Sequence, residues 1–239
     1  MTGSIRAVLF DFGGTLYDYR SLEPGDHESL IELARLAGVK EGLERVPQAY
    51  REALRRVFKD YLVRPYYLHA DMFRDAVVAM VRDLGGEASA DHLDRYRHRQ
   101  WEHHRRDFQL REGAVETLQE LRRRGLGLGV VSNIDDAQLV HLAELASLAR
   151  YFDWLLSSEA ARSCKPDPAI FAEALRRAGC RPEEALFVGD SLPQDIAGAN
   201  RAGLRSVLIW NRPDREPPVD GVRPRHVIRR LPELLDLVG

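Results

Sequence analysis

The sequence is poor in cysteine and in lysine. Two cysteines, Cys164 and Cys180, occur in 239 residues, and their spacing matches no metal-binding or redox motif. Two thiols in a chain of this length cannot build a disulfide framework, so we expect a protein of the reducing cytoplasm. Of the 35 basic residues only three are lysine, namely Lys40, Lys59 and Lys165, so each lysine invites a chemical explanation.

Long apolar runs and an excess of one charge are also missing. Near the N-terminus, the apolar run of residues 7–10 is far shorter than the ~20 residues of a membrane span. It does not resemble a signal peptide either, so we expect neither secretion nor membrane insertion. Because 35 Lys and Arg nearly balance 37 Asp and Glu, giving a net charge of −2, the sequence predicts no nucleic-acid partner and no anionic membrane surface as partner.

The hydrophobic pattern divides the chain into an α/β part and an inserted helical part. Residues 7–10 are typical of a buried strand, whereas residues 28–108 show helical spacing with no strand-like alternation. Beyond that stretch strands and helices alternate, which predicts a doubly wound, mostly parallel sheet with helices on both faces. We therefore expect an α/β core at 1–16 and 109–239 and an α-helical cap at 17–108.

Side chains that can do chemistry stand near the ends of several predicted strands. Asp11 follows the first strand, Ser132 ends the second, and Asp190 follows a later one. Lys165 precedes a helix, and Asp195 comes shortly after Asp190. Ligands of parallel sheets bind beyond the carboxyl ends of the strands, so we expect these groups to meet there. Carboxylates, a hydroxyl and a compact cation suit phosphoryl transfer assisted by a hard metal ion.

Four segments, in this order, resemble the motifs of the haloacid dehalogenase (HAD) superfamily. They are Asp-Phe-Gly-Gly-Thr-Leu at 11–16, Val-Ser-Asn at 131–133, Lys-Pro-Asp-Pro at 165–168 and Val-Gly-Asp-Ser at 188–191, followed by Asp195. The helical insertion lies where members with a type 1 cap carry that domain. The resemblance implies a HAD-like core and a helical cap that closes over the active site, excludes water and selects the substrate.

The resemblance also implies a role for the matching side chains. Asp11 is the nucleophile that attacks phosphorus and forms an aspartyl-phosphate, which water then hydrolyses. Ser132 donates its hydroxyl to a phosphoryl oxygen, and Lys165 neutralises the Asp11 carboxylate and the transferring group. The predicted substrate-binding residues are Gly14, Thr15, Ser132, Asn133 and Lys165.

A Mg²⁺ site is implied by the same motifs. Asp11, Asp190 and the backbone carbonyl of Gly13 would share the ion, because a hard cation prefers oxygen ligands. Asp195 would support this site or one of its waters. We therefore expect Mg²⁺ as the cofactor and a small phosphorylated metabolite as the substrate.

The sequence departs from the phosphatase pattern at Gly13. Phosphatases of the superfamily carry a second Asp there, which acts as general acid on the leaving group, and glycine cannot transfer a proton. Because a positioned acid–base group contributes ~10²–10⁴ in rate, we expect modest rates or a narrow range of leaving groups. Tyr17, Asp18 and His69 are candidate replacements, none of them marked by a specific motif.

Three alternatives to a Mg²⁺-dependent phosphohydrolase stay open. Phosphonate hydrolases of the superfamily also lack the second Asp but use a cap lysine, for which Lys59 is the candidate. 2-Haloacid dehalogenases lack it too, yet they use no Mg²⁺ and usually lose the Gly-Asp pair that this chain keeps at 189–190. The third alternative is a catalytically weak member that binds phosphate and metal for regulation.

For two histidine-containing segments outside the motifs, the sequence predicts structural roles. His98, His103 and His104 stand among many Arg and Glu residues, which is typical of a solvated helix face. Tyr67 and His69 suit the lining of a substrate pocket, but they suit core packing between helices better.

Overall fold

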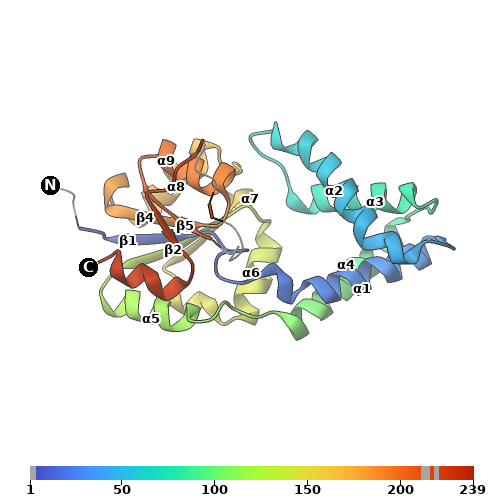
Figure 1. Cartoon of the computed structure of the whole chain (residues 1–239), viewed down its shortest axis with the longest axis horizontal. Helices are drawn as coiled ribbons and strands as arrows, with labels where there is room; N and C mark the ends of the chain where they lie inside the picture. The colour runs from blue at the N-terminus through green and yellow to red at the C-terminus, as the bar shows by residue number, and fades with distance from the viewer. Residues whose placement is uncertain (1–3, 211–215, 218–220) are drawn as a thin grey trace. The chain divides into compact units, whose positions relative to one another are not determined.

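The computed structural model describes residues 4–210, 216–217 and 221–239 (Figure 1). The chain divides into two compact units. An α/β unit comprises Met1–Asp18 and Gln109–Gly239, and a helical unit comprises Tyr19–Phe108. Parts of the predicted core, residues 1–3, 211–215 and 218–220, lie outside the described residues.

A parallel sheet forms the centre of the α/β unit. Among the described residues it has six strands in the order β3-β2-β1-β4-β5-β6, and each neighbouring pair is parallel. The strands are β1 Ala7–Phe10, β2 Gly127–Ser132, β3 Trp154–Ser157, β4 Ala185–Gly189, β5 Arg205–Ile209 and β6 His226–Ile228. All four residues of β1 are buried, as expected for a central strand covered on both faces. The predicted doubly wound α/β fold is confirmed.

The strand order reverses beside β1. The chain passes from β1 through β2 to β3 on one side, and it then starts again with β4 on the other side of β1. Phe10 of β1 is in register with Val130 of β2 and with Val188 of β4. The three strands therefore end close together, at the kind of switch point where open α/β sheets bind their ligands.

Helices cover both faces of this sheet, with α8 and α9 on one face and α5 on the other (Figure 1). The α-helices of this unit are α5 Ala114–Arg123, α6 Asp136–Leu145, α7 Ser158–Ala161, α8 Pro168–Ala178 and α9 Ala197–Arg201. The ring of Phe171 in α8 packs 5.2 Å from the ring of Phe187 in β4. Gly198 lets α9 approach closely, because a Cβ at this position would overlap the Phe171 ring.

Shorter helical turns connect these elements. The 3-10 segments lie at Tyr19–Ser21, Leu43–Arg45, Leu148–Tyr151, Pro182–Glu184 and Leu231–Asp236. A π-helical turn, Leu192–Ile196, joins the end of β4 to α9 and carries one of the predicted site residues, Asp195.

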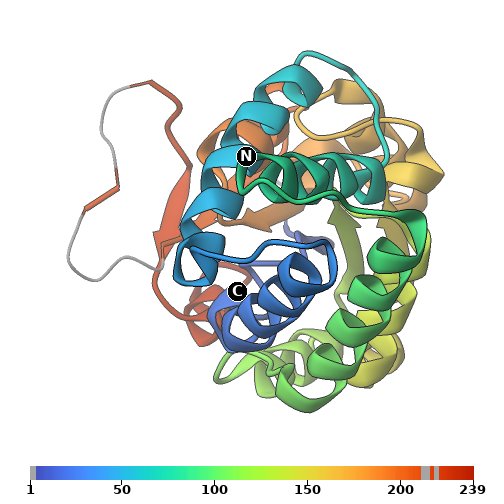
Figure 2. The same ribbon diagram turned by 90° about the vertical axis from the view of Figure 1, so that its right-hand side faces the viewer.

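The helical unit consists of four long helices and the turns between them. They are α1 Glu23–Leu36, α2 Val46–Leu62, α3 His69–Asp83 and α4 Ala90–Asp107. Helix α1 packs beside α4, and α2 packs beside α3 (Figure 2). Ser89 starts α4 with a capping box, in which its hydroxyl accepts from the N–H of His92 at 3.2 Å. In the described part of the chain, no helix is both long and apolar enough to cross a membrane.

His103 and His104 lie on the buried side of α4, so the expectation of a solvated face was wrong for them. Each is 3% exposed. His103 Nδ1 lies 2.6 Å from the carbonyl oxygen of Gly25, and because a carbonyl can only accept, Nδ1 carries the proton. The side chain of His98, in contrast, is 78% exposed. The many Arg and Glu residues of α4 made the whole helix look exposed in the sequence, but they do not show which side of α4 is covered by α1.

We expect Phe171→Ala to lower the free energy of unfolding by about 3–5 kcal/mol, since the substitution removes a fully buried ring between α8 and the sheet. Val140→Ala, at a position that is 52% exposed, is the control and should change stability by less than about 0.5 kcal/mol. Urea denaturation followed by circular dichroism measures both. Equal midpoints for the two variants would contradict this account of the core.

Candidate active site

Asp11 lies directly after β1, and its carboxylate is contacted by donors from two other segments of the chain and from its own turn. The residue is 6% exposed. Ser132, at the end of β2, donates its hydroxyl to Asp11 Oδ1 at 3.0 Å, and Lys165 Nζ donates to the same oxygen at 2.6 Å. Thr15 Oγ1 lies 3.4 Å from Oδ2. These contacts fix the orientation of the carboxylate that the sequence predicts as the nucleophile.

Lys165 holds two carboxylates at once. Its ammonium donates to Asp11 Oδ1 at 2.6 Å and to Asp195 Oδ1 at 2.7 Å, and the side chain is 1% exposed. Burial by itself would lower the pKa of Lys165, but the two carboxylates outweigh that effect and raise the pKa above its usual value. Lys165 is therefore a permanently charged part of the site.

Asn133 positions the segment that carries Lys165. Its side-chain Nδ2 donates to the carbonyl oxygen of Lys165 at 2.9 Å, and its Oδ1 accepts from the N–H of Lys165 at 2.7 Å. Both ends of the amide are thus used on one backbone unit. The predicted contact between Asn133 and a substrate stays a prediction, and the observed contacts give the residue a positioning role.

Asp190 and Asp195 follow β4 and complete an acidic cluster with Asp11. One carboxylate oxygen from each of the three lies within 4.8 Å of the others. Asp195 is buried and accepts from the N–H of Ser191 at 2.9 Å, besides its bond to Lys165. Asp190 is half-buried, and within the described ranges no group donates a hydrogen bond to its carboxylate.

Burial and neighbouring charges raise the pKa of both Asp190 and Asp195. Burial is the largest cause of the raised pKa of Asp190, which reaches about 7, and the charges of Asp11 and Asp195 add to it. Burial also raises the pKa of Asp195 to about 6, although Lys165 opposes the shift. A cluster that favours protons so strongly also favours another positive charge, such as a metal ion.

Two glycines allow this close approach. Gly14 has a φ of +82°, and a Cβ there would overlap the Asp190 carboxylate. A Cβ on Gly189 would overlap the side chain of Asp195. Gly13, the residue that departs from the phosphatase pattern, forms an isolated backbone bridge with Tyr17. The turn after Asp11 is therefore packed directly against the acidic cluster.

Arg111 lies at this turn and was not selected from the sequence. Its guanidinium donates to the Gly14 carbonyl oxygen from Nη2 at 2.6 Å and from Nε at 3.2 Å. In the sequence it is one arginine among many and belongs to none of the four motifs. Its place just after the helical insertion was the one available signal.

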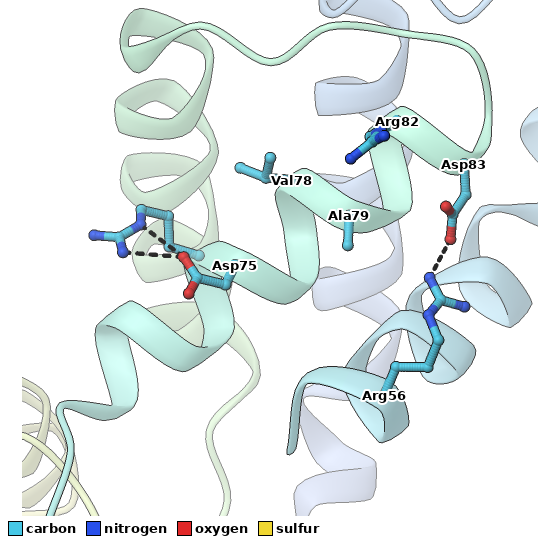
Figure 3. A pocket seen from close by; sticks show the side chains of 7 residues that line it. Arg56, Asp75, Val78, Ala79, Arg82 and Asp83 are labelled. Carbon is cyan, nitrogen blue, oxygen red and sulfur yellow. Dashed lines mark hydrogen bonds and ion pairs between the residues drawn. The ribbon is translucent and has the colours of Figure 1, made fainter. Parts of the chain in front are cut away.

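The helical unit contains a pocket of about 680 Å³ that includes none of the predicted site residues (Figure 3). It is lined by Arg56, Arg74, Asp75, Val78, Ala79, Arg82 and Asp83. Arg56 pairs with Asp83, and Arg74 pairs with Asp75 at 3.0 Å (Figure 3). The lining of this pocket contains no lysine, no serine and no group of three carboxylates like that around Asp11.

Tyr67 and His69 pack within the helical unit. The two rings lie 4.7 Å apart, and the Tyr67 ring also lies 5.2 Å from that of Tyr61. Tyr67 and His69 are each 6% exposed. These contacts agree with core packing, the reading that the sequence favoured for this segment.

We expect Asp190→Asn to stabilise the metal-free protein at high pH. Since the folded-state pKa of Asp190 is about 7 and the ordinary value is 3.8, stability falls as the pH rises through this window. In EDTA at pH 8 the variant should be more stable than the wild type by about 1–3 kcal/mol, and near pH 4 the difference should vanish. Asp94→Asn, at a position whose side chain is 71% exposed, is the control. Parallel pH profiles of urea denaturation for wild type and Asp190→Asn would refute the assignment.

Comparisons with known proteins identify the family of this chain. The family model of haloacid dehalogenase-like hydrolases matches residues 5–203. Glyceraldehyde 3-phosphate phosphatase of Methanopyrus kandleri is 34% identical over 238 residues, which cover 98% of this chain and 97% of that protein. Ribulose-1,5-bisphosphate 5-phosphatase of Halopiger xanaduensis is 30% identical over 251 residues, with coverage of 98% and 99%.

A solved structure extends the similarity to the whole fold. The magnesium-bound crystal structure of the HAD-type hydrolase YfnB from Bacillus subtilis matches with a TM-score of 0.80 and 25% identity. The match covers 99% of this chain and 100% of that one. The motif order, the parallel sheet, the cluster around Asp11 and these similarities lead to one conclusion: the chain belongs to the haloacid dehalogenase-like hydrolases.

Proposed function

We propose that this hydrolase is a Mg²⁺-dependent phosphatase of a small phosphorylated metabolite, with Asp11 as nucleophile. The observation that carries the proposal is the arrangement around Asp11, where a buried lysine, a serine hydroxyl and two further carboxylates converge. The names of the two relatives, both phosphatases of small sugar phosphates or triose phosphates, support the same substrate class. The proposal also assigns the enzyme to the cytoplasm, in line with its two free thiols.

Asp11 would act in two steps. In the first, an Asp11 carboxylate oxygen forms a bond to phosphorus while the bond to the ester oxygen breaks, and that oxygen leaves with the electron pair. In the second, water attacks the phosphorus of the aspartyl-phosphate, which releases inorganic phosphate and restores the Asp11 carboxylate. Ser132 and Lys165 hold Asp11 in place and put a hydroxyl and a positive charge where the phosphoryl oxygens gain negative charge.

The residues beside Asp11 fit a magnesium ion. Three carboxylates lie close together, and Asp190, the one without a hydrogen-bond donor in the described residues, is the natural ligand to pair with Asp11. Asp195 already accepts hydrogen bonds from Lys165 and from the N–H of Ser191, so it would support the metal site or one of its waters. When bound, the ion would neutralise charge on the phosphoryl group. The carbonyl of Gly13 remains the predicted third protein oxygen.

Gly13 would limit which substrates react well. No side chain at this position can give a proton to the leaving oxygen, so good leaving groups such as acyl phosphates or sugar 1-phosphates should be favoured. Tyr17, which is 4% exposed and pairs with Gly13 through its backbone, stays a candidate for a replacement acid. Asp18 stays one as well, with its carboxylate 3.9 Å from Arg111.

Residues 17–108 would act as the cap that selects the substrate. The phosphonate alternative requires a lysine in this part, and Lys59 lies in α2. Loss of phosphonate cleavage in Lys59→Ala, with phosphate release unchanged, would favour that alternative. Halide release without added metal would favour the dehalogenase alternative.

We expect phosphate release to require both Mg²⁺ and Asp11. Suitable substrates are acetyl phosphate, p-nitrophenyl phosphate, glyceraldehyde 3-phosphate and ribulose 1,5-bisphosphate. EDTA should abolish the activity, and Asp11→Asn should lower kcat by roughly 10³-fold or more, because the amide is a poor nucleophile. Asp91→Asn, at an exposed position of α4, is the matched control and should retain full activity. Turnover that persists in Asp11→Asn would overturn the assignment of the nucleophile.

We expect Gly13→Asp to speed up poor leaving groups selectively. The new carboxyl group can protonate an alkoxide but adds little for acetyl phosphate, whose leaving group needs no proton. The rate for alkyl phosphates should rise by about 10–10²-fold, below the full contribution of a positioned acid. The ratio of the kcat/KM values for glyceraldehyde 3-phosphate and acetyl phosphate measures this effect. An unchanged ratio would mean that another residue already supplies the proton.

A further inference from the structure

Arg111 is attached to the turn that follows Asp11 by its backbone and by its side chain. Its backbone N–H donates to the Leu16 carbonyl oxygen at 2.9 Å, and the preceding residue, Leu110, forms an antiparallel bridge with Tyr17. Its guanidinium places two N–H groups on the Gly14 carbonyl oxygen. The side chain is 14% exposed. An arginine fork on one acceptor fixes direction as well as distance.

The turn itself is short and closed by its own hydrogen bonds. The N–H of Gly14 donates to the Tyr17 carbonyl oxygen at 2.9 Å, and the N–H of Leu16 donates to the Phe12 carbonyl oxygen at 2.9 Å. These bonds hold the turn in shape but do not attach it to the rest of the α/β unit. Arg111 supplies an attachment from a segment 97 residues away in the sequence.

Gly14 connects Arg111 to the acidic cluster. The Gly14 carbonyl oxygen accepts hydrogen bonds from the Arg111 guanidinium. The α-carbon of Gly14 lies so close to the Asp190 carboxylate that a Cβ on Gly14 would overlap it. A displacement of the Gly14 peptide would therefore alter the space between Asp11 and Asp190. Arg111 also places a second positive charge, besides Lys165, near a cluster of three carboxylates.

Arg111 also contacts the residue at which the chain leaves the α/β unit, close to the point where the chain returns to that unit. The α/β unit ends its first segment at Asp18 and resumes at Gln109. The Arg111 guanidinium lies 3.9 Å from the Asp18 carboxylate, so one side chain contacts both the outgoing and the returning segment.

We propose that Arg111 is a positioning residue. It clamps the Gly14 carbonyl and so holds the turn after Asp11 at a fixed position relative to the carboxylates of Asp11 and Asp190. The kinetic part of this inference rests on the proposed phosphatase function. The clamp itself is a property of the fold and has a readout that does not depend on turnover.

Arg111→Gln and Arg111→Lys test the clamp. Glutamine removes the charge and the fork, whereas lysine keeps the charge and one donor. For acetyl phosphate with Mg²⁺, kcat of Arg111→Gln should fall by about 10–10²-fold while KM changes by less than about threefold, since a small misplacement near the reacting atoms acts on the transition state. Arg111→Lys should restore part of the loss.

Amide hydrogen exchange read by mass spectrometry gives the second readout. In Arg111→Gln, peptides that cover residues 12–17 should exchange faster than in the wild type, because the turn has lost the two side-chain hydrogen bonds to Gly14 and keeps only its backbone contacts with residues 110 and 111. The matched control is Arg124→Gln, since Arg124 also bonds a backbone carbonyl, that of Leu235 at 2.7 Å, and pairs with Glu120. The control should leave exchange at 12–17 and kcat unchanged.

The outcomes separate the clamp from the proposed function. If Arg111→Gln behaves like Arg124→Gln in both kcat and exchange, the clamp is refuted. If the wild type releases no phosphate but exchange at 12–17 is faster in Arg111→Gln, the clamp stands and the phosphatase proposal falls. If Arg111→Gln does not fold, Arg111→Lys decides, and wild-type kcat and exchange in that variant would refute the need for the fork.

Discussion

The rest of the site depends on the ion pairs that the ammonium group of Lys165 forms with two carboxylates. The ammonium group lies between Asp11 and Asp195 at 2.6 and 2.7 Å, almost without contact with solvent. A buried lysine without partners would lose its proton, and buried carboxylates without a cation would take one up. The two carboxylates raise the pKa of Lys165, and Lys165 opposes the rise that burial causes in the pKa of Asp195. The backbone of Lys165 is in turn held by Asn133.

The sheet topology makes this arrangement possible. Because β1 lies between β2 and β4, Asp11 comes next to Ser132 on one side and next to Asp190 on the other. Helices or antiparallel strands would not bring three carboxyl ends to one edge in this way. Gly14 and Gly189 have no Cβ, which leaves room for the carboxylates of Asp190 and Asp195 to approach the backbone closely.

The turn after Asp11 distinguishes this chain from the phosphatase pattern. With glycine at 13, this position offers backbone groups but no acidic side chain, and the turn is held both by its own hydrogen bonds and by contacts from outside. The arginine at 111 contributes two of those contacts from the returning segment.

The sequence by itself determined the strands and the order of the four motifs, and it predicted Asp11, Lys165 and Asp190 as candidate site residues. Buried strands have short apolar runs, and parallel sheets place ligand-binding groups at strand ends, so local patterns were sufficient. Only the tertiary structure decided that Asn133 bonds the backbone of Lys165, that Arg111 reaches Gly14 and that His103 is buried. The partners in these contacts lie 32, 97 and 78 residues apart, and no local periodicity encodes which distant groups will meet.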